Sequence, residues 1–311
     1  MSYPSLSIII PTYNGAQTLP ELLAMVSVQT VPIQELIIID SSSEDNTIAI
    51  AEEHGAEFIK IDKKDFDHGG TRTLAARQAK GEIIVFFTQD AIPASKDALE
   101  ILIKPFSKDK DISVCYGRQL PAFDADLFAS HLRYFNYPSQ SVTRCLDDRK
   151  RLGLKTIFVS NSFSAYRRSV LKDIGFFKNG LIFGEDTCTV GRILLKKKKI
   201  AYVAQARVYH SHNYCITDEL KRYFDIGVLH SMEKWLLDTY GTAEGRGVEF
   251  VKSEMAFLVR AKQFHLLPVS ILRNTLKLIT YKAGRFHSCF PKRLVILLSM
   301  HKAWWKKKDR E

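Results

Sequence analysis

The chain has 311 residues, of which 46% are hydrophobic and 25% are charged. This composition excludes a disordered chain and a fibrous repeat, and the length suits one large domain or a domain with an appendage. No apolar run approaches the roughly 18 residues that a membrane-spanning helix needs, and the first residues show no secretory signal. The 5 cysteines are scattered, which disfavours a disulfide framework or a Cys-x-x-Cys zinc site and fits a reducing, cytosolic compartment.

The formal net charge of +11 is concentrated at one end of the chain. Residues 260–311 carry 13 basic and 2 acidic side chains, whereas residues 1–215 carry 27 basic and 24 acidic ones. A basic end of this kind favours contact with an anionic surface, either lipid headgroups or nucleic acid.

The first 120 residues alternate short apolar runs with helical patterns. We expect strands at residues 6–10, 36–39, 58–61 and 83–87, and helices at about 18–29, 47–55 and 70–80. This alternation predicts an α/β fold, with a mostly parallel twisted sheet and helices on both faces. Ligands of such sheets lie outside the carboxyl ends of the strands, where the polar clusters at residues 12–14, 40–43 and 88–90 fall.

The pattern is less regular after residue 120. Residues 121–156 are expected to be rich in loops, 157–160 and 200–203 to be strands, 167–174 a helix, and 218–237 an amphipathic helix. We place a boundary near residue 215. It separates a predicted α/β domain at residues 1–215 from a helical, basic extension at residues 216–311.

Dinucleotide-binding, P-loop and nucleophile-elbow motifs are absent from the sequence. The remaining candidates are polar strand ends, each with a functional and a structural interpretation. Asp40 can accept hydrogen bonds from a nucleotide base or ribose, or it can cap the following helix. Asp90 can bind a divalent cation that bridges two phosphates, or it can cap a helix.

The second half of the chain offers two further pairs of candidates. Glu185 and Asp186 can include a general base, or they can simply favour the positive end of a helix dipole. His210 and His212 would point to opposite faces if their strand continues, so that one of them could join a metal. Such a histidine pair is more often structural.

The order of these pieces is more specific than any one of them. Matching segments occur at residues 6–14, 38–47, 69–72, 81–87, 163–168, 174–176, 185–186 and 208–210, with Arg192 between the last two. In this order the chain, over about residues 4–212, resembles the family 2 glycosyltransferases, which are inverting enzymes. The resemblance implies a GT-A, Rossmann-like fold in which residues 1–215 form the nucleotide-sugar-binding catalytic domain. It also implies that the enzyme is a hexosyltransferase.

The resemblance assigns roles to residues that match the family's motifs. Asp186 corresponds to the catalytic base, with Glu185 beside it. Asp90 corresponds to the last acid of the metal motif, and His210 to a third metal contact, with His212 as an alternative. The nucleotide-sugar-binding residues implied are Pro11, Thr12, Tyr13, Asp40, Ser42, Asp67, His68, Arg72, Gln89 and Asp90.

One departure from the family concerns the metal motif. The sequence there is Thr88-Gln89-Asp90, so the first acid is missing. A single carboxylate should bind Mg²⁺ or Mn²⁺ more weakly, and this puts strict metal dependence in doubt.

Three segments further resemble the bacterial rhamnosyltransferase branch of the family: residues 65–72, 88–91 and 210–214. That branch uses dTDP-β-L-rhamnose in building O-antigen and other cell-surface polysaccharides. Transfer with inversion would give an α-rhamnoside. The alternatives are a family member that uses a UDP- or GDP-sugar, and a non-catalytic sugar-nucleotide or carbohydrate-binding relative. A nucleotidyltransferase lacks its glycine-rich loop here.

The basic tail is predicted to form one or two amphipathic helices over residues 266–305, with Pro268 at the start and a break at Gly284. Trp304 and Trp305 beside a lysine cluster suit a membrane interface. The alternatives are a helix packed on the catalytic domain and a nucleic-acid surface. The resemblance favours contact with the membrane, because the polysaccharide acceptors of such enzymes are usually carried on a polyprenyl diphosphate at the cytoplasmic leaflet. We therefore expect a cytoplasmic protein, peripheral at the inner leaflet, with no nucleic-acid partner.

Overall fold

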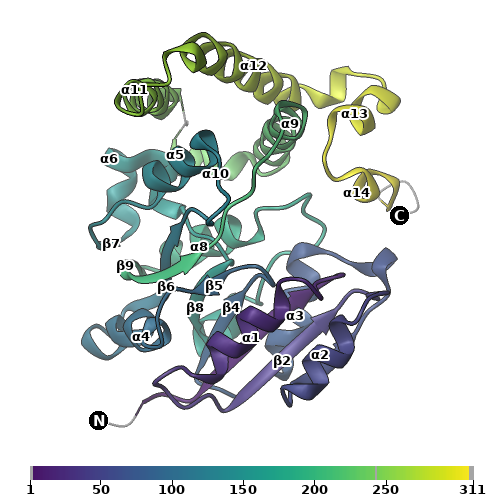
Figure 1. The fold of residues 1–311 in the computed structure, drawn as a ribbon, viewed down its shortest axis with the longest axis vertical. Coiled ribbons are helices and arrows are strands. Elements are labelled where there is room, and N and C mark those ends of the chain that lie inside the picture. The colour runs from purple at the N-terminus through teal and green to yellow at the C-terminus, as the bar shows by residue number, and fades with distance from the viewer. Residues whose placement is uncertain (1–2, 242–243, 308–311) are drawn as a thin grey trace.

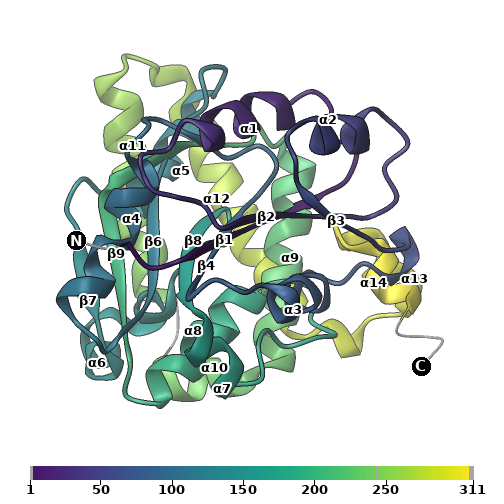
Figure 2. The same cartoon turned by 90° about the horizontal axis from the view of Figure 1, so that it is seen from below.

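The computed structural model describes residues 3–241 and 244–307. One 9-stranded sheet runs through it in the order β3-β2-β1-β4-β8-β6-β9-β5, and β7 pairs with β9 (Figures 1 and 2). The strands are β1 (Leu6–Thr12), β2 (Glu35–Asp40), β3 (Glu57–Lys60), β4 (Ile83–Phe87), β5 (Ile92–Pro93), β6 (Ile112–Leu120), β7 (Val142–Arg144), β8 (Phe163–Arg167) and β9 (Lys199–Tyr209).

Strands β3, β2, β1 and β4 run parallel to one another, and β6 runs parallel to β9. Strands β5 and β7 are antiparallel to β9. Strand β8 is antiparallel to both β4 and β6, so that it joins the two parallel parts into a mixed sheet. The predicted α/β class with a mostly parallel sheet is confirmed. The carboxyl ends of β1, β2 and β4 meet at one edge, which we call the rim.

The sheet is covered on both faces, as predicted. Alternate residues of β1 and β4 belong to two different core clusters, because successive side chains of a strand point to opposite faces. Ile9 and Phe86 pack against one set of helices, and Ile8 and Val85 against the other. This double coverage explains why both strands are continuous apolar runs.

The helices of one face are α1 (Leu19–Ser27), α2 (Thr47–Glu53) and α4 (Ala98–Lys108). Those of the other face include α3 (His68–Gln78), α7 (Arg168–Asp173), α8 (Glu185–Leu195), α9 (Ile216–Met232) and α10 (Lys234–Tyr240). The remaining helices are α5 (Leu127–Asn136), α6 (Arg149–Leu152), α11 (Glu244–Arg260), α12 (Leu267–Arg285), α13 (Lys292–Leu298) and α14 (Lys302–Lys307).

Four sequence predictions about elements are wrong. Residues 121–156 contain α5, which Asp126 caps by accepting the Ala129 N–H at 2.7 Å. Residues 157–160 are not a strand, since β8 begins at Phe163. The helix expected at residues 218–237 is divided at Glu233 into α9 and α10.

The fourth error concerns Gly284, which lies inside α12 and is not a break. A Cβ added there would overlap the Phe224 carbonyl oxygen, and one added at Gly227 would overlap the Tyr281 carbonyl oxygen. The two glycines therefore let the backbones of α9 and α12 approach closely. Pro268 does stand in the first turn of α12, as predicted.

The end of the chain folds back onto the sheet region. Trp305 is only 8% exposed, and Trp304 donates its indole N–H to the Gly180 carbonyl at 3.2 Å. Helix α14 is thus packed on the α/β region, and its tryptophans do not form the membrane-facing surface that we expected of them. Within the described ranges, no helix has both the length and the apolar character to cross a bilayer. The division into two domains near residue 215 stays a prediction.

Candidate active site

The rim begins with Thr12 and Asp40, the last residues of β1 and β2, which lie side by side in register. The Thr12 hydroxyl donates to Asp40 Oδ1 at 2.9 Å, and the Ser43 N–H donates to Asp40 Oδ2 at 2.7 Å. Asp40 is fully buried. Its carboxylate therefore ties the loops after β1 and β2 together, as well as being the predicted nucleotide contact.

Gln89 joins the loop after β1 to the loop after β4. Its Oε1 accepts the Tyr13 N–H at 2.9 Å, and its Nε2 donates to the Tyr13 carbonyl at 3.2 Å. The Tyr13 ring lies under the Lys63 ammonium, 4.3 Å from the ring centroid. Gln89 thus fixes the backbone of Tyr13 at both its N–H and its carbonyl, which is a structural reason for an amide at this position.

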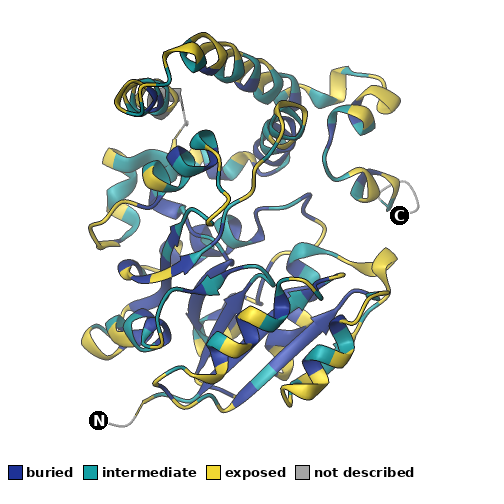
Figure 3. Cartoon of the chain, viewed as in Figure 1, coloured by how far each residue is buried: buried dark blue, intermediate teal, exposed yellow. Residues whose placement is uncertain are grey.

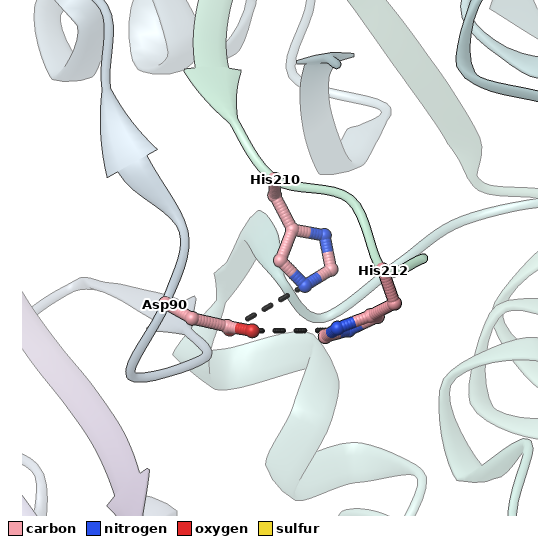
Figure 4. A group of neighbouring side chains, drawn as sticks. All are labelled: Asp90, His210 and His212. Carbon is pink, nitrogen blue, oxygen red and sulfur yellow. Dashed lines mark ion pairs between the residues drawn. The ribbon is translucent and has the colours of Figure 1, made fainter. Parts of the chain in front are cut away.

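Asp90, His210 and His212 converge at the next point along the rim (Figure 4). His210 Nε2 lies 3.4 Å from Asp90 Oδ1, and His212 Nε2 lies 3.7 Å from Asp90 Oδ2. The two histidines do not point to opposite faces, because β9 ends at Tyr209 and the chain turns. We call these three residues the Asp90 group.

The chemistry of the Asp90 group fits a divalent metal. One ligand atom from each residue lies within 4.8 Å of the others. The His210 Nδ1–H donates to Gln119 Oε1 at 3.0 Å, so that the lone pair of Nε2 is left toward Asp90. Burial is the main cause that lowers the pKa of His212 to about 4, which keeps this imidazole neutral at pH 7. Two imidazoles and one carboxylate suit Mn²⁺ better than Mg²⁺, which prefers oxygen.

Glu185 and Asp186 occupy the first turn of α8 and have different surroundings. Glu185 is buried, and its Oε1 lies 3.2 Å from Arg72 NH1 and accepts the Asn161 amide at 3.2 Å. Asp186 is half-buried and accepts the Thr187 N–H at 2.7 Å and the Asn161 N–H at 3.3 Å. The resemblance implies that Arg72 is one of the residues that bind the nucleotide sugar. In the structure its carboxylate partner is Glu185.

These surroundings move the two pKa values apart. Burial, and then the negative charge of Glu185, raise the pKa of Asp186 to about 7. Burial opposes ionisation of Glu185 too, but the charges of Arg72 and His68 prevail and lower its pKa below the ordinary value. A carboxylate that takes up a proton near neutral pH has the property of a general base.

The three predicted aspartates lie along one connected network. Gln119 accepts from His210 and donates to the Ser160 hydroxyl at 3.0 Å, and the next residue, Asn161, holds both Glu185 and Asp186. From one end to the other, contacts or chain neighbours link Asp40, Thr12, Tyr13, Gln89, Asp90, His210, Gln119, Ser160, Asn161 and Asp186. Asp40, Asp90 and Asp186 are therefore joined by one path of contacts.

The other predicted residues lie around this network with structural partners. Pro11 is paired in register with Ile39. Ser42, at φ +63°, donates to the Ile61 carbonyl at 2.8 Å. Asp67 caps α3 and accepts the Gly180 N–H at 3.0 Å, and the His68 ring lies edge-on to His301 at 5.3 Å.

Several residues near the site were not predicted: Gln119, Arg133, Asn161, Arg222 and His301. Asn161 carried a usable signal, because a polar Ser-Asn-Ser sequence directly precedes the strand β8. The others come from distant segments that only the fold brings together.

Comparison with known proteins gives a consistent result. The model of the family described as glycosyl transferase family 2 matches residues 7–175. This chain belongs to that family. It is 41% identical over 302 residues to the O-antigen chain rhamnosyltransferase RfbN of Salmonella typhimurium, covering 96% of each protein. It is 42% identical over 304 residues to WbaN of Salmonella anatum, also an O-antigen chain rhamnosyltransferase, covering 97% of this chain and 96% of WbaN.

Solved structures agree on the fold of this family 2 member. The mannosyltransferase PcManGT of Pyrobaculum calidifontis, solved with GDP-Man and Mn²⁺, matches with a TM-score of 0.58 and 16% identity, covering 99% of this chain and 88% of that one. TarS residues 1–349 of S. aureus match with a TM-score of 0.57 and 18% identity, with the same coverage of 99% and 88%. The predicted GT-A fold and glycosyltransferase class are confirmed.

Proposed function

We propose that this glycosyltransferase transfers L-rhamnose from dTDP-β-L-rhamnose to a saccharide acceptor during O-antigen synthesis. The observation that carries the proposal is the identity of 41–42% with two O-antigen chain rhamnosyltransferases over nearly their full length. The proposal gives the loops after β1, β2 and β4 the role of holding the nucleotide. Asp186 lies at the far end of the path of contacts that begins at Asp40, and the acceptor hydroxyl is proposed to bind there.

Asp186 acts as the general base in this mechanism. Its carboxylate takes the proton of an acceptor hydroxyl, and the hydroxyl oxygen bonds to the anomeric carbon of rhamnose. The bond from that carbon to the diphosphate oxygen breaks with inversion, and its electron pair leaves with dTDP. Asn161 fixes the carboxylate through its backbone N–H, and the Glu185–Arg72 pair keeps a negative charge beside it.

The Asp90 group holds the metal in this proposal, with His210 and His212 as its nitrogen ligands. A bound divalent cation would neutralise charge that develops on the departing diphosphate. The chain's own contribution is orientation, because Gln119 Oε1 accepts a hydrogen bond from His210 Nδ1–H and so directs Nε2 to the site. Burial alone would raise the pKa of Asp90, but His210 and His212 beside it hold that pKa well below its usual range.

The acceptor is proposed to be an oligosaccharide on a polyprenyl diphosphate, met at the inner leaflet by a cytoplasmic, peripheral protein. Helix α12, the turns at its two ends and α13 expose apolar side chains that we call the apolar strip: Phe264, Ile271, Leu272, Leu278, Ile279, Phe286 and Leu297. No acid occurs between Glu254 and Asp309 in the sequence, and thirteen basic residues lie at 260–311. Apolar side chains among basic ones suit an anionic membrane surface.

A donor panel tests the proposal. The protein is incubated with a lipid-linked saccharide acceptor and with dTDP-L-rhamnose, a UDP-sugar or a GDP-sugar, and release of nucleoside diphosphate is measured. We expect acceptor-dependent release of dTDP alone and an α-rhamnoside by NMR. Release from a UDP- or GDP-sugar would replace the donor assignment, and no release from any donor would favour a non-catalytic binding protein.

A further inference from the structure

Arg222, on the helix α9, lies beside the site but belongs to none of the groups discussed so far. Its guanidinium carbon is 5.8 Å from the centroid of the Phe183 ring and 6.0 Å from that of Tyr214. The Tyr214 ring is in turn 5.3 Å from the ring of His212. A single aromatic ring therefore separates the Arg222 guanidinium from the Asp90 group, and two rings restrict its position.

Nothing nearby neutralises the charge of Arg222. In the described part of the chain, no carboxylate oxygen lies within 4.0 Å of its nitrogens. Its neighbours are mostly groups that are cationic or can become so. Burial, and then the charges of His68 and Arg222, lower the pKa of His301 to about 3. Arg222 also contributes to the lowered pKa values of His68 and His212, in which burial is the largest cause.

A second arginine approaches the same place from the helix α5. Arg133 donates to Gln119 Oε1 at 2.8 Å, while its buried Nε has no hydrogen-bond partner. Burial lowers the pKa of Arg133, and the charge of Arg222 lowers it further, whereas Asp90 opposes this change. Arg133 thus shares the Gln119 amide oxygen with His210 of the Asp90 group.

Two other arginines of this protein use their guanidinium groups on protein oxygen atoms. Arg273 pairs with Glu219, with an N–O distance of 2.8 Å, and Arg192 donates to the carbonyls of Ile174 and Phe176. Arg222 is exposed, and among the described residues its guanidinium lies against the rings of Phe183 and Tyr214. An exposed, positioned guanidinium next to a metal-type group is suited to an anionic ligand, because its planar fork can donate two hydrogen bonds to phosphate oxygens.

We propose that Arg222, with Arg133 behind it, binds one phosphate of a diphosphate whose other phosphate reaches the Asp90 group. This inference deepens the proposed function and rests on it for the source of the ligand. The diphosphate belongs either to the sugar-nucleotide donor or to the polyprenyl carrier of the acceptor. In both cases the helical region supplies a positive charge to the reaction site.

Titration calorimetry tests this with three probes: inorganic pyrophosphate, dTDP, and farnesyl diphosphate in detergent micelles, each with Mn²⁺. The variants are Arg222→Gln, Arg222→Lys and the control Lys221→Gln on the same helix. A charge-assisted hydrogen bond contributes enough that we expect Arg222→Gln to raise the Kd of pyrophosphate roughly ten- to a hundredfold. Arg222→Lys should recover part of the loss, and Lys221→Gln should remain within about twofold of the wild type.

The other two probes identify the source. Weaker binding of dTDP alone assigns the site to the donor, and weaker binding of farnesyl diphosphate alone assigns it to the acceptor carrier. Equal binding of all three probes by the wild type and Arg222→Gln, with unchanged circular dichroism, would overturn the inference. So would a wild type that binds none of them. Pyrophosphate binding that depends on Arg222, in a protein that releases no dTDP from dTDP-rhamnose, would reject the proposed donor and keep the inference.

Discussion

The sheet region, residues 6–209, and the helical region, residues 216–307, bury their side chains differently. Strands β1 and β4 are buried along nearly their whole length. Helices α11 and α12 lie at the outside of the molecule, with long exposed surfaces (Figure 3). Ile271 and Leu272 in α12 are 50% and 58% exposed, while Lys277 and Glu254 are buried. In the proposed function, the buried sheet region carries the reacting groups, and the exposed helical region contacts the membrane that holds the acceptor.

The two regions meet at α9 and at the turn between α13 and α14. Asp225 of α9 accepts the N–H of Met300 at 2.9 Å, which holds His301 stacked on Phe183 at a ring distance of 5.8 Å. The same turn brings His301 against His68. Removal of the residues from Met300 onward would therefore alter the site as well as any membrane contact. Point variants separate the two effects better.

The largest expected effect is a loss of kcat, caused by a substitution within the sheet region. Asp186→Asn should lower kcat by roughly two to four orders of magnitude, because the base is lost, while the donor Kd stays close to that of the wild type. The folded protein disfavours the charged form of Asp186, so the variant should melt no lower than the wild type at pH 8. Substantial residual kcat in a steady-state assay would reject Asp186 as the base.

A smaller loss is expected at the Asp90 group. Asp90→Ala removes the group's single carboxylate and should weaken Mn²⁺-dependent donor binding by roughly ten- to a hundredfold. The difference between donor Kd values with Mn²⁺ and with EDTA measures this effect. If the variant keeps the metal-dependent difference of the wild type, the Asp90 group does not hold the metal.

The pH dependence sharpens the same side of the comparison. Burial and the charge of Glu185 raise the pKa of Asp186 to about 7, and only the unprotonated carboxylate can accept a proton. The kcat should therefore rise with pH through the neutral range and fall about tenfold per unit below it. The protonated form is favoured by folding, so this residue's contribution to stability decreases as pH rises from about 4 to 7. A kcat independent of pH between 5 and 8 would contradict the assignment.

The helical region is tested by its apolar strip. The double variant Leu272→Glu with Ile279→Glu should lower sedimentation with anionic liposomes by about tenfold or more, because two apolar contacts are replaced by negative charges. Transfer to a soluble acceptor should be unchanged. Val28→Glu, which alters an equally exposed apolar residue of the sheet region, is the matched control. Equal loss in both variants would mean that the strip is not the membrane surface.

The smallest effect concerns the contact between α9 and α12. Gly284→Ala would place a methyl group against the Phe224 carbonyl and should lower the free energy of unfolding by about 1–3 kcal/mol. Gly247→Ala in α11, where an added Cβ meets nothing within 4 Å, is the control and should not destabilise. Urea unfolding measures both. An unchanged Gly284→Ala midpoint would show that the two helices can separate at little cost.

The sequence predicted the sheet region better than the helical one. Strands such as β4 are short apolar runs between turn residues, a local signal that burial on both faces enforces. Helix α5 was missed although Asp126 is a regular N-cap before an amphipathic run. Gly284 was read as a break because glycine is a poor helix former, yet close packing against α9 repays that cost.

Resemblance to the family marked Asp186 as the candidate base. The sequence by itself determined the α/β class and the polar residues at strand ends. Those features depend on local periodicity and on the rule that parallel strands end at one edge. Only the tertiary structure decided that both histidines face Asp90, that Asn161 holds the Glu185–Asp186 pair, and that Arg222 and His301 reach the site. Contacts between residues far apart in the chain have no local pattern, because they arise from packing of whole elements.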